Sequence, residues 1–452
     1  MSRSRIPVIG GGLAGSEAAW QLAERGHEVD LFEMRPERET PAHRTGDLAE
    51  VVCTNSFKSE ALDTPHGLLK AEARMLGSLL LEVADATRVP AGSALAVDRT
   101  LFAREVTRRV AAHPRIRLRL EEVTELPPGP AVVATGPLTS DALSEAIRRR
   151  LGADNLAFFD AIAPIVSRES IREEAAWMAS RYGKGEADYL NCPLDEPGYE
   201  AFVDALLAAD VHEGHDWEAV SYFEGCLPIE VMARRGRDTL RHGPMRPVGL
   251  PDPRTGRIPH AVVQLRREDR AGRMWNLVGF QTRLRIGEQG RVFRLIPGLE
   301  EAEFLRWGAI HRNSYVNFPA GLTPHGSPPD DPGLLLAGQL TGVEGYTESL
   351  ASGLLAAIQV DRLLQGLAPS VPPADTMLGG LYRYLREADP AHFQPMNANF
   401  GLLDPAPGRP RGRRARRQAQ ATRAIRALRD WCAEVDWPVR PVAEPDPAAS
   451  GA

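Results

Sequence analysis

The sequence lacks any apolar run that approaches the roughly 20 residues of a membrane-spanning helix. Hydrophobic residues make up 43% of the 452-residue chain and charged residues 25%, which is typical of a globular protein with core enough for several domains. The N-terminal stretch MSRSRIPVIGGGLAG has too short an apolar run and too many glycines for a signal peptide. We therefore expect a cytoplasmic protein with no membrane partner.

Paired cysteines are also missing. The four cysteines are Cys53, Cys192, Cys226 and Cys432, and none belongs to a CxxC pair. No group of histidines and cysteines has zinc-site spacing, so we expect no bound metal. Cytoplasmic chains of this size rarely use disulfides, and free cysteines are among the most buried residues. Each thiol is therefore taken as a packing residue unless its neighbours indicate chemistry.

The chain has no surplus of positive charge. Its net charge is −6, so no overall field attracts nucleic acid. The charge is uneven, however, because residues 409–429 contain nine arginines and no acid. Such a run can be a solvated helical face, but its composition favours contact with phosphates. We predict that RNA is bound by Arg413, Arg414, Arg416 and Arg417.

One complete βαβ pattern is present, in PVIGGGLAGSEAAWQLAERGHEVDLFEMRP near the N-terminus. An apolar strand is followed by a turn with G-x-G-x-x-G spacing, which permits close approach of the backbone to a pyrophosphate at a helix N-terminus. Glu33 ends the second strand, where its carboxylate can accept hydrogen bonds from ribose hydroxyls. The predicted dinucleotide contacts are Gly10, Gly12, Leu13, Ala14, Gly15 and Glu33.

Two later segments indicate that the dinucleotide is FAD. AVVATGPLT, at residues 131–139, is an apolar strand ending in Ala-Thr-Gly, like the second contact of flavoproteins with two dinucleotide-binding domains. GLLLAGQLTGVEGYTES, at residues 333–349, resembles the C-terminal segment of those flavoproteins that returns to the flavin. Gln339 stands where they usually have an acid. The chain has no second G-x-G-x-x-G, so we expect no separate NAD(P)H domain. Further predicted contacts are Gly136, Gly338, Gln339, Gly345 and Tyr346.

These motifs predict an α/β fold with a Rossmann-like FAD-binding domain of the two-dinucleotide-binding-domain type. Because flavin motifs lie near both ends of the chain, the middle third must be an insertion. We predict a discontinuous FAD-binding domain over residues 1–152 and 325–440, and an inserted α+β domain over residues 153–324. Residues 441–452 have the composition of a disordered tail.

Two cysteines have neighbours that would activate a thiol. Cys53 lies in LAEVVCTNSFKSE, where an apolar run gives way to hydroxyl, amide and lysine side chains. Cys226 precedes Pro228, near a predicted helix start, and lies close to several arginines. Helix N-termini and nearby cations favour the thiolate. Cys192 and Cys432 lack such surroundings, so we expect them to be structural.

Several segments together resemble one family. They are GGGLAGSEAAWQLAERGHEVDLFEMRP, TPAHRTGDLAEVVCTNSFKSE, FEGCLPIEVMARRGRDTLRHGPMRPVGL, TRLRIGEQGRVFRLIPGLEEAEFLRWGAIHRNSY, AGQLTGVEGYTES and FQPMNANFGLL. From residue 6 to about residue 403, the chain is similar to the folate- and FAD-dependent tRNA (uracil-5-)-methyltransferases (TrmFO), of the GidA-related flavoproteins. The first segment fits many flavoproteins, whereas GCLPIEVMARRG and QPMNANFGL are much more specific.

The resemblance implies methylation of C5 of the T-loop uridine of tRNA. Methylenetetrahydrofolate would donate the carbon, reduced FAD the electrons, and NADH or NADPH would reload the flavin. Uracil C5 is a poor nucleophile, but a thiolate that adds at C6 turns the ring into an enolate that can attack the one-carbon unit. A base must then remove the C5 proton. By resemblance, Cys226 is the nucleophile and Cys53 the base or flavin-side partner, and the reverse assignment stays open.

Other family positions are less specific. Tyr346, which follows Glu344 and Gly345, is expected either to cover the flavin ring or to be a packed aromatic residue. Either a contact to folate carboxylates or flavin phosphates, or a place in a solvated loop, is expected for His43, Arg44, Arg283, Arg285, His311 and Asn313. The sequence leaves open whether the chain is a monomer or a weak dimer, and which nicotinamide it prefers.

Four other functions are weighed against this one. A flavin oxidoreductase for a small molecule would be favoured by a redox-active CxxC pair, which is missing. A GidA-like enzyme for wobble uridines shares the N-terminal motif but is longer, with an extra C-terminal helical domain. An S-adenosylmethionine methyltransferase would not explain the segments around Gly136 and Gly338. The fourth is a noncatalytic RNA-binding flavoprotein.

Overall fold

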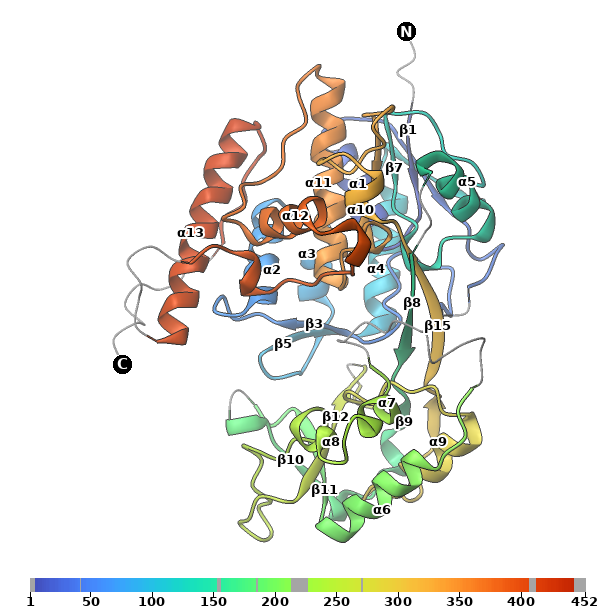
Figure 1. Ribbon diagram of the computed structural model, residues 1–452, viewed down its shortest axis with the longest axis vertical. Helices are drawn as coiled ribbons and strands as arrows, with labels where there is room; N and C mark the ends of the chain where they lie inside the picture. The colour runs from blue at the N-terminus through green and yellow to red at the C-terminus, as the bar shows by residue number, and fades with distance from the viewer. Residues whose placement is uncertain are drawn as a thin grey trace.

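The computed structural model describes residues 5–40, 42–152, 156–183, 186–212, 227–269, 271–405 and 412–442, except the side chains of residues 156–162, 309–314 and 392. The described chain forms an upper part and a lower part in the view of Figure 1, and two long strands run between them. None of the described helices is long and apolar enough to cross a membrane.

A five-stranded parallel sheet forms the centre of the upper part. Its order is β16-β7-β1-β2-β6, so segments from both ends of the chain lie side by side. Val8, Leu31 and Val132 are fully buried, as expected for a parallel sheet covered on both faces. The strands are β1 (Ile6–Ile9), β2 (Val29–Glu33), β6 (Ile116–Leu120), β7 (Ala131–Val133) and β16 (Leu334–Leu336). The predicted α/β Rossmann-type fold is confirmed.

Two helices pack tightly beside this sheet, α1 (Leu13–Glu24) and α11 (Tyr346–Leu364). A Cβ at Gly353 of α11 would lie 2.1 Å from the carbonyl oxygen of Ala14, so this position requires glycine. The close crossing brings the N-termini of both helices to the same region. The other helices of the upper part are α2 (Pro65–Met75), α3 (Leu79–Ala86), α4 (Arg99–Ala112), α5 (Asp141–Leu151), α10 (Phe318–Gly321), α12 (Met377–Glu387) and α13 (Arg413–Glu434).

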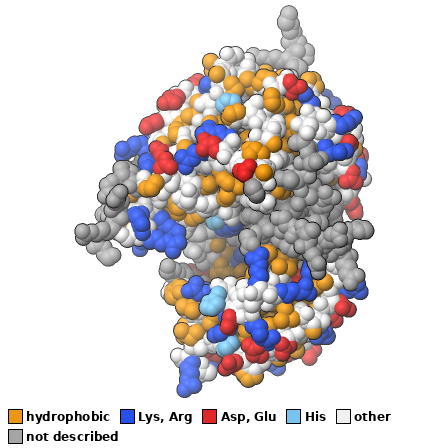
Figure 2. All heavy atoms as spheres, in the orientation of Figure 1, with side chains coloured by type: hydrophobic (Ala, Val, Ile, Leu, Met, Phe, Trp, Pro, Cys, Tyr) orange, Lys and Arg blue, Asp and Glu red, His pale blue; other side chains and the backbone are white. Residues whose placement is uncertain are grey.

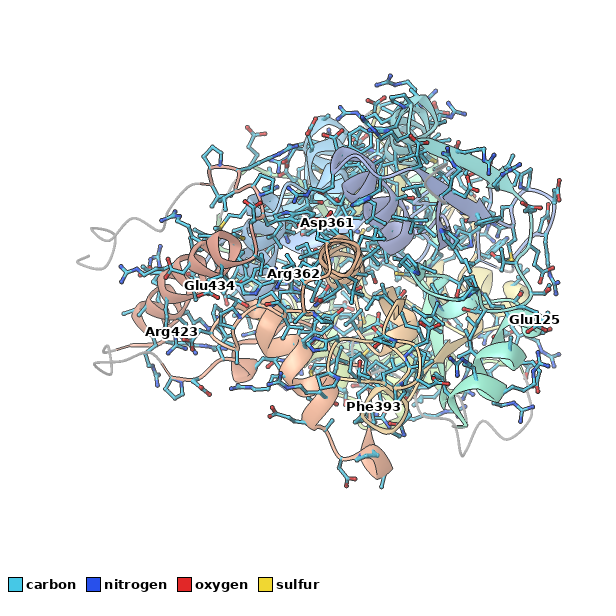
Figure 3. The ribbon with its side chains drawn as sticks, turned by 90° about the horizontal axis from the view of Figure 1, so that it is seen from above. Glu125, Asp361, Arg362, Phe393, Arg423 and Glu434 are labelled. Carbon is cyan, nitrogen blue, oxygen red and sulfur yellow. The ribbon has the colours of Figure 1, made fainter. Side chains whose placement is uncertain are left out.

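Buried hydrogen bonds join the first and last thirds of the chain. The Glu72 carboxylate accepts from the backbone N–H groups of Met377 (2.7 Å) and Leu378 (2.9 Å), where α12 begins. Burial raises the pKa of Glu72 to about 7, and the two N–H donors oppose that rise. Trp437, after α13, donates its indole N–H to the carbonyl oxygen of Leu76 (3.1 Å). Seen from above, α13 lies at one edge of the molecule, opposite Glu125 (Figure 3).

The lower part is built on a six-stranded antiparallel sheet of order β10-β11-β12-β13-β9-β14. Its own core includes Phe202, Trp275 and Phe293. The strands are β9 (Ile165–Ser167), β10 (Trp177–Met178), β11 (Tyr189–Leu194), β12 (Ala261–Arg267), β13 (Met274–Leu277) and β14 (Phe304–Arg306). The helices are α6 (Glu196–Leu207), α7 (Ile229–Arg234), α8 (Thr239–His242) and α9 (Ile286–Phe293).

The chain enters the lower part through β8 (Leu156–Ile162) and returns through β15 (Ala309–Tyr315), which pair antiparallel (Figure 1). Val316 and Phe318 then pack into cores of the upper part. The chain therefore rejoins the upper part before residue 325, the predicted boundary, because the apolar residues after β15 pack there. Of the predicted tail, residues 443–452 lie outside the described residues.

A small antiparallel sheet of the upper part faces the insertion. It consists of β3 (Ser56–Ser59), β5 (Ala94–Val97) and β4 (Arg88–Val89). The insertion contacts the loop before β5, where Tyr189 donates to the carbonyl oxygen of Ala91 (3.1 Å) and Asp188 accepts from the N–H of Gly92 (2.6 Å). These hydrogen bonds fix the sheet, and the loop that precedes it, against the insertion.

Candidate active site

A cavity of about 340 Å³ is lined by residues of both parts. The insertion contributes Arg266, Asn276 and Gln281, among others. Of the residues predicted from the sequence as cofactor contacts or reactive thiols, those that line it are Gly10, Gly12, Leu13, Ala14, Glu33, Cys53, Gly136, Gly338, Gln339, Gly345 and Tyr346. Segments from three separate regions of the sequence thus converge on one site.

The glycine turn after β1 opens into this cavity. Gly10 has φ +100°, and a Cβ there would lie 2.6 Å from the carbonyl oxygen of Ala134, so only glycine fits. A Cβ at Gly12 would meet no protein atom within 4 Å, so this residue leaves room for a ligand. Gly15 has a different place: its Cβ would lie 1.8 Å from the carbonyl oxygen of Gly10, so it allows α1 to pack under the turn and does not line the cavity.

The Glu33 carboxylate ends β2 beside the turn. It accepts hydrogen bonds from the N–H of Gly11 (2.9 Å) and from the backbone N–H and Nε of Arg35 (3.0 and 2.9 Å). Burial alone would raise the pKa of Glu33, but Arg35 and these N–H groups outweigh it and hold the pKa below its usual value. Glu33 is therefore an ionised acceptor at the cavity wall, as a ribose-binding acid must be.

The two later flavin-type segments meet the glycine turn. Gly136 has φ +67° and open space where a Cβ would be, and it lines the cavity wall after β7. The Gly338 N–H donates to Ser352 Oγ (2.6 Å), which fixes the turn after β16. Gln339, the departure from the usual acid, donates its amide to Glu344 (2.9 Å). The open space at Gly12 and Gly136, and the ionised Glu33, together fit FAD.

Tyr346 holds the loop that carries Cys53. Its hydroxyl accepts from the backbone N–H groups of Cys53 (3.0 Å) and Thr54 (3.2 Å) and donates to the carbonyl oxygen of Thr54 (3.0 Å). The Cys53 Sγ lies 3.0 Å from the same hydroxyl. Burial, and then the nearby Cys53, raise the pKa of Tyr346 well above its usual value, so it is a neutral phenol. Its ring also packs against Phe57, with centroids 5.6 Å apart.

Arg99, the first residue of α4, fixes the same loop from the other side. Its Nη1 donates to the carbonyl oxygens of Val51 (2.6 Å) and Val52 (2.7 Å), immediately before Cys53. Its Nη2 pairs with Glu268 of the insertion at 3.0 Å. Burial would lower the pKa of Arg99, but Glu268 outweighs this and raises it. The residue therefore links the thiol loop to the insertion.

A second link runs through Arg266 at the end of β12. Its guanidinium donates to Asn55 Oδ1 (2.8 Å) and Thr54 Oγ1 (2.8 Å), while Asn55 donates to the carbonyl oxygens of Val97 (2.9 Å) and Arg267 (3.0 Å). None of Arg99, Glu268, Arg266 and Asn55 is among the site residues predicted from the sequence. Only Asn55 had a signal, because it lies in the polar run after Cys53. No motif marks the other three, which are distant from that run in sequence.

The other predicted thiols differ in their surroundings. Cys192 and Cys432 are fully buried, and burial raises the pKa of each to about 12, so neither is a ready thiolate. Cys226 lies outside the described residues. Among the described residues, no group of His, Cys, Asp and Glu is arranged to hold a metal ion.

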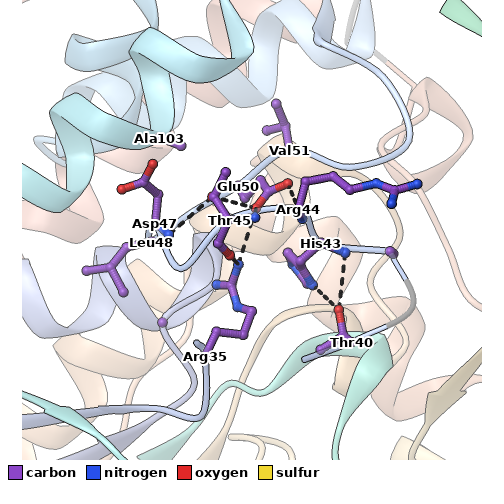
Figure 4. Close-up of polar contacts among 12 residues, drawn as sticks. Arg35, Thr40, His43, Arg44, Thr45, Asp47, Leu48, Glu50, Val51 and Ala103 are labelled. Atoms are coloured by element: carbon purple, nitrogen blue, oxygen red, sulfur yellow. Dashed lines mark hydrogen bonds and ion pairs between the residues drawn. The ribbon is translucent and has the colours of Figure 1, made fainter. Parts of the chain in front are cut away.

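The less specific candidates lie in different places. His43 lines the cavity, with Nδ1 2.6 Å from Thr40 Oγ1, and the side chain of Arg44 extends from the same loop (Figure 4). Arg283 is buried beside Glu230 and Arg285 is exposed before α9; neither lines the cavity. The side chains of His311 and Asn313 lie outside the description.

The predicted arginine run lies at the start of helix α13, whose inner face is buried through Ala421, Ala424 and Leu428. Arg413, Arg414 and Arg416 are exposed, whereas the guanidinium of Arg417 lies 5.3 Å from the centroid of the Phe400 ring. The guanidinium of Arg414 lies 3.6 Å from the carboxylate of Asp63. Lys and Arg side chains gather over this region at the left of the upper part (Figure 2).

Known proteins resemble this chain over most of its length. Residues 5–368 match the family Glucose inhibited division protein A (GIDA). The methylenetetrahydrofolate–tRNA-(uracil-5-)-methyltransferase TrmFO of Desulforudis audaxviator is 56% identical over 95% of this chain and 98% of its own length. A protein of that name from Thermus thermophilus is 53% identical over 96% and 98%. The structure of Aquifex aeolicus GidA, 18% identical, has a TM-score of 0.69 and covers 95% of this chain and 76% of its own.

We predict that Gly12→Val excludes FAD without unfolding the protein. Gly12 has φ −72°, which valine can adopt, and its added side chain would project into open space in the cavity. The purified parent should be yellow with stoichiometric FAD, and the variant colourless, by flavin absorbance per chain. Gly287→Ala in α9, also with open space around its Cβ, should stay yellow. Stoichiometric FAD in Gly12→Val would contradict this assignment.

Proposed function

The chain belongs to the family of methylenetetrahydrofolate–tRNA-(uracil-5-)-methyltransferases, within the GidA family, and we propose that it methylates C5 of a uridine in tRNA. Methylenetetrahydrofolate is the carbon donor and FAD the cofactor. The observation that carries the proposal is that one cavity brings together the glycine turn, Glu33 and the thiol of Cys53. A flavin site beside a half-buried thiol matches a reductive methylation.

The substrate position and the reductant belong to the same proposal. The resemblance of the chain to its family supports the T-loop uridine as the target and NADH or NADPH as the source of electrons. A methylene unit must gain a hydride equivalent to become a methyl group, so a reductant has to act beside the thiols. When bound, FAD supplies those electrons.

The two thiols have separate roles in this mechanism. Cys226 adds to C6 of uracil, which makes C5 nucleophilic towards the one-carbon unit. Cys53 then removes the C5 proton or acts on the flavin side. What supports this for Cys53 is its place at the cavity wall, half-buried, with its Sγ beside the neutral Tyr346 hydroxyl. Burial raises the pKa of the phenol, so the phenol keeps its proton. The neutral hydroxyl then orients the thiol.

The tRNA is proposed to contact the start of α13. Arg413, Arg414, Arg416 and Arg417 lie within two turns, so their guanidiniums can follow a phosphate backbone. Arg417 stacks on Phe400, which limits its reach and orients it. Arg423, further along the helix, pairs with Asp375 and donates to backbone carbonyls, so it is structural.

The methyl source tests the proposed function directly. With unmodified tRNA, NAD(P)H and the FAD-loaded protein, label from methylenetetrahydrofolate should appear in 5-methyluridine by nucleoside mass spectrometry. Label from S-adenosylmethionine should not appear in the product, because this donor transfers a complete methyl group and has no use for a flavin. Without NAD(P)H, product should stop at a single turnover of pre-reduced flavin. Sustained methylation without a reductant would contradict the mechanism.

The cysteine roles are tested by trapping with an RNA that carries 5-fluorouridine at the target. Cys226→Ala should abolish both methylation and the covalent adduct while FAD stays bound, because C6 addition needs that thiolate. Cys53→Ala should lose methylation but still form the adduct. Cys192→Ala and Cys432→Ala are the controls and should retain activity. An adduct that persists in Cys226→Ala and disappears in Cys53→Ala would reverse the roles.

The α13 contact is tested by its salt dependence. Replacing Arg413, Arg414, Arg416 and Arg417 with glutamine should weaken tRNA binding, and each lost phosphate contact should reduce the slope of log K against log salt by roughly one. The matched control replaces Arg148 and Arg149 on α5, across the upper part from α13, where both pair with glutamates (Figure 1). An unchanged slope in the α13 variant would mean that these arginines form a solvated helical face and do not contact tRNA phosphates.

A further inference from the structure

An exposed aromatic ring stands at one turn of the insertion, in a backbone conformation that tyrosine rarely adopts. Tyr182, in the turn Arg181–Gly183, is 57% exposed and has φ +60°. The left-handed region is unfavourable for a residue with a bulky side chain, and an exposed ring gains little from burial. Strained residues that persist in a structure cluster at functional sites, so Tyr182 is a candidate for binding.

The backbone of a neighbouring turn supports this ring. The turn is formed by residues 247–250, where the N–H of Leu250 donates to the carbonyl oxygen of Pro247 (3.1 Å). A Cβ at Gly249 would lie 2.8 Å from two carbon atoms of the Tyr182 ring, so only glycine lets the ring lie this close. The Tyr182 N–H donates to the carbonyl oxygen of Gly249 (2.8 Å). The ring is therefore held against backbone on one side and is open to solvent elsewhere.

Arg181 holds the backbone of a second arginine beside the ring. Its guanidinium donates to the carbonyl oxygen of Arg246, the residue before the turn, at 2.9 Å and to Gln264 Oε1 at 3.0 Å. Burial, and then the charge of Arg246, lower the pKa of Arg181. Arg246 itself is exposed. An aromatic ring and a cation thus share one surface of the insertion.

Arg246 ends a basic run, RRGRDTLRHGPMR at residues 234–246, which has five arginines and a single acid. Two of these arginines have partners within the fold. The guanidinium of Arg237 donates to the Glu200 carboxylate (2.7 Å), and that of Arg241 donates to the single acid of the run (2.9 Å). No carboxylate in the described part of the chain forms an ion pair with Arg246, so its charge is available to an anion from outside the chain.

The surface that carries the ring continues into the cavity wall. Pro244, two residues before Arg246, packs against Gly279, where a Cβ would lie 2.7 Å from the proline Cβ. The backbone oxygen of Gln264 accepts from the N–H of Val278 (2.9 Å). Gly279 and Val278 both line the cavity. A polymer with its reacting unit in the cavity can therefore lay an adjoining unit on this surface.

The proposed reaction at C5 of uracil restricts what this surface binds. An enzyme that acts on a base takes it out of its stack, and the neighbouring base then loses a stacking partner. An aromatic side chain replaces that partner for any base, because every base has a π-face. A guanidinium beside the ring neutralises the adjoining phosphate. An exposed ring next to an available arginine has the composition that such a nucleotide requires.

We propose that Tyr182 stacks on a base of the RNA next to the target uridine, while Arg246 binds the adjoining phosphate. The assignment rests on the proposed function and adds to it an RNA contact made by the insertion. The β10 edge of the insertion sheet, shortly before Tyr182 in the chain, lies on the same side of the molecule as α13 (Figure 1). One RNA can therefore contact α13 and the insertion from one side.

The test measures equilibrium binding of unmodified tRNA to FAD-loaded protein by fluorescence anisotropy at several salt concentrations. Tyr182→Ala should weaken binding about tenfold, as expected for one lost base stack. It should leave the slope of log K against log salt unchanged, because no charge is lost. Tyr182→Phe should bind as the parent does, because stacking needs only the ring. Arg246→Gln should weaken binding and reduce the slope by roughly one.

Three further variants serve as controls. Tyr182→Gly suits φ +60° and removes the ring, so it should fold as the parent does and bind tRNA as weakly as Tyr182→Ala. Leu295→Ala removes another exposed apolar side chain of the insertion, and Arg172→Gln an exposed arginine that pairs with Glu300. Both should bind tRNA as the parent does. FAD content should be the same in all variants, because neither Tyr182 nor Arg246 lines the cavity.

Distinct results would overturn the proposal. Parental tRNA affinity in both Tyr182→Ala and Tyr182→Gly would mean that the ring does not contact RNA. A loss in Tyr182→Phe equal to that in Tyr182→Ala would assign a hydrogen bond of the hydroxyl in place of stacking. A change in sedimentation with unchanged tRNA affinity would identify a contact between two copies of the chain. A parent that neither binds nor methylates tRNA would remove the proposed function as well, whereas a parent that does both, beside variants that bind equally well, would remove the subsite alone.

Discussion

The hydroxyl of Tyr346 accepts two backbone N–H groups and donates to a carbonyl oxygen on the loop that carries Cys53, and the site depends on this contact. A loop that passes through a cavity wall has polar backbone groups that need partners. The phenol supplies those partners from the first residue of α11. It also places its oxygen 3.0 Å from the thiol. The position of Cys53 therefore follows from where α11 begins, and that is fixed by the tight crossing of α11 over α1.

The same loop couples the two parts of the molecule. Arg99 joins the carbonyl oxygens before Cys53 to Glu268, and Arg266 reaches from the insertion to Thr54 and Asn55. Buried ionic and polar contacts of this kind contribute little net stability, because desolvation offsets much of their attraction. They do require particular partners, so they specify how the insertion sits on the FAD-binding domain. Because both parts line the cavity, its shape depends on how they are placed against each other. A defined placement therefore matters more here than extra stability.

Much of the nucleotide end of the site could be predicted, because its signals are local. The spacing of Gly10 and Gly12, the helix after them and Glu33 at the end of a strand lie within one βαβ unit, whose geometry is set by turn sterics and hydrophobic period. The role of Gly15 as a cofactor contact stays a prediction, and in the structure this residue lies under the turn and not at the cavity wall. The G-x-G-x-x-G spacing marks Gly15 in the same way as Gly10 and Gly12, but helix packing sets the position of Gly15 under the turn. The predicted boundary at residue 325 rests on composition alone, by which the apolar residues after β15 fit either part equally well.

By itself the sequence determined the dinucleotide turn, the parallel sheet, the helix with the arginine run and the polar setting of Cys53, since each depends on residues that are near neighbours in the chain. Only the tertiary structure decided which groups surround the thiol. Tyr346 and Cys53 are 293 residues apart, and Arg99 and Glu268 are 169 apart. No local propensity links such pairs. They meet because the buried faces of α1, α11 and the two sheets pack closely, and that packing brings distant polar groups to a common wall.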